Sequence, residues 1–146
     1  MTPADQTRAL LGAAVAFTWL TVAASSVGSG AQAPPGSDGW QIPASASTES
    51  NPEPNNETVL VKGQRLFKTK CQRCHGADGS GHGPDADPDH PAGNLTDARL
   101  AARNPDGVMF YKIWNGRAKP KMPPMKVDLT REEVWMVVQY VKTLRK

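Results

Sequence analysis

Five residues near the middle of the chain, Cys71-Gln72-Arg73-Cys74-His75, decide how the rest of the sequence is interpreted. On a helical turn, residues i and i+3 share one face and residue i+4 lies beside them. The two thiols and the imidazole would therefore emerge together. This C-x-x-C-H spacing is typical of c-type haem attachment, in which both thiols bond to one porphyrin and the histidine approaches the iron.

Two other chemistries use paired cysteines. A zinc site could add His82 and His90 to the thiolates of Cys71 and Cys74. A thioredoxin-like redox pair requires a βαβ context, and the sequence around the motif has no β-rich pattern. Haem attachment is therefore favoured, with zinc as the alternative.

Three flanking stretches have helical periodicity. Residues 57–70 place apolar side chains, a glycine and the lysine stems at three- and four-residue spacings. Residues 106–115 form a second pattern that ends at Gly116. Residues 130–144 begin with a capping box and carry one apolar stripe, made of Val134, Val137, Val138, Val141 and Leu144. The sequence predicts an all-α domain.

The first of these helices carries a recognisable pattern. Gly63, Phe67 and Cys71 are spaced as Gly-x-x-x-Phe-x-x-x-Cys, which resembles the first helix of class I c-type cytochromes. Residues 75–84 and 94–97 resemble bacterial monohaem members of that family. The resemblance covers residues 57–146. It implies a small helical fold around one covalent haem, in which the first and last helices cross and Trp135 or Tyr140 lies against the Gly63 and Phe67 surface.

The same resemblance suggests the second axial ligand. Residues 117–125 read RAKPKMPPM, similar to the family's sixth-ligand loop. By that resemblance Met122 supplies the thioether to iron, because it occupies the Met-Pro position, and Met125 is the competitor. His82 or His90 could replace it, but both are expected to be exposed loop residues.

The loop between the motif and the second helix should also support the proximal histidine. A backbone carbonyl there is expected to accept the Nδ1–H of His75 and leave Nε2 for the iron. The carbonyls of Pro84, Pro88 and Pro91 are the candidates, and spacing alone does not choose among them.

The N-terminal third of the chain has a different composition. Residues 9–24 contain no charge, so residues 1–33 are expected to be a cleaved signal peptide or an uncleaved membrane anchor. Residues 34–56 are rich in proline and serine and are predicted to be a disordered linker, with Trp40 and Ile42 as isolated apolar residues. Residues 57–146 form the expected cytochrome c domain.

Whole-chain properties narrow the function. The 146 residues are 38% hydrophobic and include two cysteines, which excludes a polytopic membrane protein, a disulfide-stapled mini-protein and a large multi-domain enzyme. The net charge of +3 is the sum of −3 in the first 56 residues and +6 in the remainder, which has 16 basic and 10 acidic residues. Five basic residues and no acidic one occur within residues 107–127: Lys112, Arg117, Lys119, Lys121 and Lys126.

These features predict a one-electron carrier rather than an enzyme. With His75 and Met122 both bound to iron, no position remains for a substrate. The basic stretch is expected to dock on an acidic surface of a redox protein partner, and no motif for nucleic-acid binding accompanies it. The expected location is the periplasm or the outer face of the cytoplasmic membrane. The alternatives are an obligate haem subunit of a membrane-bound respiratory oxidoreductase complex and a haem enzyme with an open sixth site.

Overall fold

The computed structural model describes residues 39–119 and 121–145. Within these ranges the chain is helical and contains no strand. The α-helices are α1 (Glu57–Lys70), α2 (Gln72–His75), α3 (Ala98–Ala102), α4 (Asp106–Asn115) and α5 (Arg131–Thr143), and the 3-10 helices are η1 (Ala44–Ser47) and η2 (Met125–Val127). The all-α prediction is confirmed, and α1 and α4 have the predicted bounds.

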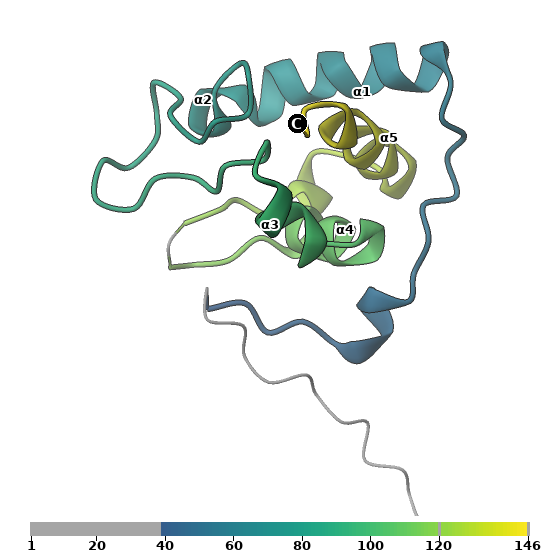
Figure 1. The fold of residues 1–146 in the computed structure, drawn as a ribbon, viewed down its shortest axis with the longest axis horizontal. Helices are drawn as coiled ribbons and strands as arrows, with labels where there is room; N and C mark the ends of the chain where they lie inside the picture. The colour runs from purple at the N-terminus through teal and green to yellow at the C-terminus, as the bar shows by residue number, and fades with distance from the viewer. Residues whose placement is uncertain (1–38, 120, 146) are drawn as a thin grey trace, which may run out of the picture.

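A glycine allows α1 and α5 to cross closely, and Figure 1 shows α1 running along one side of the molecule with α5 directly against it. A Cβ atom added to Gly63 would overlap the backbone carbonyl of Met136. One turn further along α1, the buried ring of Phe67 lies 5.3 Å from that of Tyr140, centroid to centroid. Tyr140, and not Trp135, is therefore the aromatic residue at this crossing.

The other side of α5 packs against α4. Phe110 stacks on Trp135 with ring centroids 4.2 Å apart, and on Trp114 with centroids 5.8 Å apart. Val134, Val137 and Val138 of α5 are almost completely buried. The core thus lies between α1, α4 and α5, with α5 in the centre.

Local signals in the sequence set the helix ends. The Thr130 side chain accepts from the Glu133 backbone N–H, and the Glu133 carboxylate accepts from the Thr130 N–H, so the predicted capping box begins α5. Asn56 caps α1 through the N–H of Val59. At the other end of α4, Gly116 takes a φ of 58°, which L-residues rarely adopt.

Residues 39–56 lie against the helices, so the prediction of a disordered linker is wrong for this stretch. In Figure 1 the segment passes alongside α4 and then along the edge of the molecule to the start of α1. The Asn51 amide donates to the carbonyl of Trp135 over 2.9 Å, and the Gln139 amide donates to the carbonyl of Glu53 over 2.6 Å. Composition misled the prediction because long-range hydrogen bonds, together with the buried Trp40, hold the segment.

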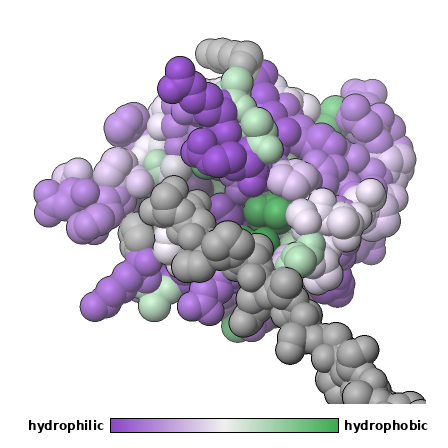
Figure 2. All heavy atoms as spheres, turned by 60° about the horizontal axis from the view of Figure 1, so that its bottom comes forward, coloured by the Kyte–Doolittle hydropathy of each residue, from purple (hydrophilic) through white to green (hydrophobic). Residues whose placement is uncertain are grey.

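The predicted signal or anchor segment, residues 1–33, and residues 34–38 lie outside the described residues. Within the described ranges, no helix is long and apolar enough to cross a membrane. Figure 2 shows one face of the molecule, on which a small hydrophobic area is set among mostly hydrophilic side chains.

Candidate haem site

The C-x-x-C-H motif occupies a helical turn that follows directly from α1. Cys71 ends α1, and its carbonyl accepts from the N–H groups of Cys74 and His75 over 3.2 Å and 2.9 Å. The turn brings Cys71, Cys74 and His75 together as the spacing predicts. Both cysteines are free thiols and partly buried, so neither is used in a disulfide.

The imidazole of His75 is held by a backbone carbonyl that was not among the candidates from the sequence. The Nδ1–H of His75 donates to the backbone oxygen of Gly93 over 3.1 Å. A carbonyl of this loop does fill the predicted role, but the candidates Pro84, Pro88 and Pro91 were wrong. The sequence carried no signal for Gly93, because only the folding of the loop brings that carbonyl to the imidazole.

Two contacts fold this loop back on itself. The Leu95 N–H donates to the carbonyl of Gly79 over 2.7 Å. Gly81, at a φ of +92°, packs so closely against the carbonyl of Ala92 that a Cβ atom there would overlap it. These contacts place residues 92–95 beside the motif, with the Gly93 carbonyl at the ring of His75.

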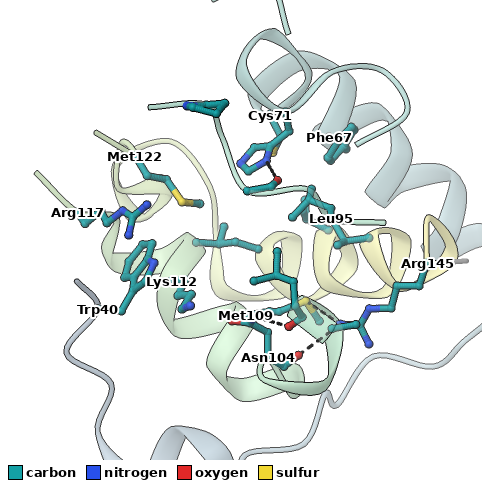
Figure 3. A pocket seen from close by; sticks show the side chains of 18 residues that line it. Trp40, Phe67, Cys71, Leu95, Asn104, Met109, Lys112, Arg117, Met122 and Arg145 are labelled. Carbon is teal, nitrogen blue, oxygen red and sulfur yellow. Dashed lines mark hydrogen bonds between the residues drawn. The ribbon is translucent and has the colours of Figure 1, made fainter. Parts of the chain in front are cut away.

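A cavity of about 240 Å³ opens next to the motif. Its walls are mainly apolar and come from all three core helices and the loops, including Phe67, Leu95, Leu100, Met109, Ile113, Val137 and Val141. Cys71 and His75 line one part of the cavity, and Met122 lines another. In Figure 3 the sulfur of Met122 is directed into this space.

The two candidate methionines are placed differently. Met122 is paired with Arg117 through two backbone hydrogen bonds of 2.8 Å and 2.9 Å, which close the loop that carries it. Met125 begins η2 and is buried in the hydrophobic core, and it does not line the cavity. The cavity therefore receives a thioether from Met122 and none from Met125.

Burial favours the neutral forms of Cys71 and His75. Desolvation, with a smaller contribution from Cys74, raises the pKa of the Cys71 thiol to about 12. Desolvation also lowers the pKa of His75, although its hydrogen bond to Gly93 opposes the shift. A neutral imidazole with its Nδ1 proton held by Gly93 presents the Nε2 lone pair for a metal.

The alternative zinc site, with His82 and His90 beside the two cysteines, is not formed by the described residues. His82 and His90 are exposed, as the sequence analysis expected. In the part of the chain that the structure describes, no three histidine, cysteine or acidic side chains come close enough together to hold a metal ion.

Several polar residues that the sequence analysis had not assigned to the cavity also line it. Lys112 and Arg117 lie at one end beside Trp40, and Arg145 lies at the other end, as Figure 3 shows. The Arg145 guanidinium donates to the carbonyl of Asn104 over 3.3 Å, and Asn104 is itself buried with no partner for its Oδ1 atom. Periodicity could not find these residues, because they come from four separate segments of the chain.

The helical fold and the motif define a c-type cytochrome. The Cytochrome c family model matches residues 60–145. The chain belongs to the cytochrome c family. No curated protein matches the sequence.

Parts of this chain match other solved structures. A chain of the Kuenenia stuttgartiensis reducing HAO-like protein complex Kustc0457/Kustc0458 is 24% identical, with a TM-score of 0.57, over 65% of this chain and 47% of that chain. Cytochrome cL of Methylophaga aminisulfidivorans is 23% identical, with a TM-score of 0.49, over 62% of this chain and 55% of that chain. This chain thus spans about half the length of each.

A shorter protein also matches. The c-type cytochrome KustC0563 is 29% identical, with a TM-score of 0.47, over 57% of this chain and 98% of that chain.

The residues present fit the family's covalent c-type haem. Cys71 and Cys74 are the motif thiols to which it would be attached. Cys71 lines the apolar cavity, which suits a porphyrin face, whereas Cys74 does not line it and its Sγ lies 3.7 Å from the carbonyl of Asp85. The two carboxylates of a haem leave one edge of the porphyrin, and the cations of Lys112 and Arg117 at one end of the cavity suit them. When bound, the haem would supply a one-electron iron couple.

Proposed function

We propose that the protein is a one-electron carrier whose haem iron is bound by His75 and Met122. The observation that carries this proposal is the cavity itself, which receives the His75 imidazole and the Met122 thioether. Two neutral ligands favour ferrous iron and raise the potential. Because both axial positions are then filled, no site remains for a substrate, and the protein acts as a carrier and not as an enzyme.

The test compares the two methionines in the haem-loaded chain. Met122→Ala should abolish the sulfur-to-iron charge-transfer band of the ferric form and allow the ferrous form to bind carbon monoxide at once. Met125→Ala should keep the band and cost about 2–5 kcal/mol of stability, since it removes a buried core side chain. Loss of the band in Met125→Ala alone would contradict the proposal. Immediate carbon monoxide binding by the wild-type protein would instead favour a haem enzyme with an open sixth site.

We further propose that the partner is a redox protein with an acidic docking surface. Lys119, Lys121 and Lys126 are exposed and flank the Met122 loop. Charges of one sign around a redox centre increase the rate of encounter with a partner of opposite charge.

The proposed location is the periplasm or the outer face of the cytoplasmic membrane, supported by the uncharged run of residues 9–24.

The second candidate is an obligate haem subunit of a membrane-bound respiratory oxidoreductase complex. Its support is the same N-terminal run, which would act as an anchor if it is not cleaved. Detergent extraction followed by size-exclusion chromatography distinguishes the two. A carrier should elute near its own mass of 15.7 kDa plus haem and detergent, whereas a subunit should co-elute with other redox proteins.

A further inference from the structure

One wall of the cavity comes from outside the part of the chain that matches the family. Trp40 precedes the matched residues 60–145, yet it lines the cavity and is only 7% exposed. Its ring lies between two cations, with the Lys112 Nζ atom 5.0 Å and the Arg117 Cζ atom 4.6 Å from the ring centroid. Figure 3 shows these three side chains together at the end of the cavity where Met122 lies.

Arg117 connects this ring to the candidate axial ligand. Its backbone N–H donates to the carbonyl of Met122 over 2.8 Å, and its carbonyl accepts from the Met122 N–H over 2.9 Å. The Trp40 indole therefore rests against Arg117, which belongs to the loop that carries Met122.

The segment that carries Trp40 is itself held along its length. The carbonyl of Ala46 in η1 packs so closely on Gly107 of α4 that a Cβ atom added to Gly107 would overlap this carbonyl. Beyond η1, the hydrogen bonds from Asn51 to the carbonyl of Trp135 and from Gln139 to the carbonyl of Glu53 attach the chain to α5. The indole is thus presented by a fixed segment, which lowers the entropy cost of placing it.

We propose that Trp40 is a positioning residue for the sixth-ligand side of the haem site. It holds the Met122 loop against the cavity through Arg117 and excludes water and small ligands from that end. This proposal rests on the proposed function, since it requires Met122 to be the axial ligand. It assigns to residues 39–56 a role in closing the site that the cytochrome c match does not cover.

The experiment measures imidazole binding to the ferric, haem-loaded full-length chain. In Trp40→Ala the Met122 loop loses two cation–π contacts and its cover, so the association constant for imidazole should rise about tenfold. Trp40→Phe keeps an aromatic face for Arg117 and should restore most of the wild-type resistance. If Trp40→Ala does not fold, Trp40→Phe still allows the role of the indole to be tested.

Two further variants make the outcome decisive. Val59→Ala removes a buried side chain of α1 that does not line the cavity, so it lowers stability and should leave imidazole binding unchanged. Met122→Ala marks the affinity of a site with no sulfur ligand. If Trp40→Ala binds imidazole as weakly as the wild type, or if Val59→Ala binds it as well as Trp40→Ala, the role of Trp40 is refuted. If the wild type already binds imidazole as tightly as Met122→Ala, the proposed ligation by Met122 fails instead.

Discussion

The imidazole of His75 and the backbone carbonyl of Gly93 meet at 3.1 Å although they are 18 residues apart in the sequence. A hydrogen bond at Nδ1 fixes the ring orientation and raises the basicity of Nε2. The bond depends on the loop folding back at Gly81, which packs directly on the carbonyl of Ala92. The properties of the haem iron should therefore respond to a change at Gly81, whose N–H also donates to the backbone carbonyl of His75 over 2.7 Å.

Gly81→Ala should disturb this support. The new Cβ atom would overlap the carbonyl of Ala92 at a φ of +92°, so residues 92–95 must move and stability should fall by about 1–3 kcal/mol. Weakening the Gly93 bond makes His75 a poorer electron donor, so the reduction potential should rise. Potentiometric titration and denaturant unfolding measure the two effects.

Pro88→Ala is the control for this change. Pro88 is exposed in the same loop and does not line the cavity, so stability and potential should stay close to the wild type. Equal potentials in the two variants would show that the loop does not tune His75.

The close crossing of α1 and α5 predicts that one methyl group added at Gly63 will greatly lower the stability of the fold. Gly63→Ala would place its Cβ atom on the carbonyl of Met136, which is backbone and cannot move without separating the helices. Stability should fall by about 2–4 kcal/mol in denaturant unfolding. Gln64→Ala, at an exposed position of the same helix, should change stability by less than about 0.5 kcal/mol, and a similar loss in both variants would contradict the close crossing.

The capping box of α5 gives a smaller effect. Thr130→Ala removes the side-chain oxygen that accepts from the Glu133 N–H over 3.2 Å, so stability should fall by about 1 kcal/mol in thermal or denaturant unfolding. Thr58→Ala, exposed in the first turn of α1, serves as the control and should be nearly neutral. A neutral Thr130→Ala would mean that packing alone positions the start of α5.

The basic surface should control electron transfer to anions. The rate of oxidation by hexacyanoferrate(III) should decrease as salt is added, because screening shortens the reach of the charges. Lys119→Glu combined with Lys121→Glu should slow the reaction at low salt by about tenfold and flatten its salt dependence. Lys62→Glu combined with Lys68→Glu makes the same change in net charge on α1 and should have a smaller effect. Equal slowing by both pairs would show that net charge, and not the surface around Met122, sets the rate.

Much of the fold could be predicted because its signals are local. The bounds of α1 and α4 follow from apolar periodicity over ten to fourteen residues. The start of α5 follows from the spacing of Thr130 and Glu133. The haem motif depends on only five consecutive residues, because one helical turn is enough to bring two thiols and an imidazole together.

Relationships between distant segments were decided by the tertiary structure. The Gly93 carbonyl reaches His75 only because the loop folds back at Gly79 and Gly81. A backbone carbonyl is present in every residue, so the sequence does not indicate which one forms this bond. Trp40 is part of the cavity wall, where Lys112 and Arg117 contact its ring, and the sequence separation between them hides this contact. The sequence by itself determined the helices and the attachment chemistry, which depend on near neighbours. The tertiary structure decided which carbonyl supports His75 and which of Met122 and Met125 reaches the cavity, because those depend on the final positions of the loops.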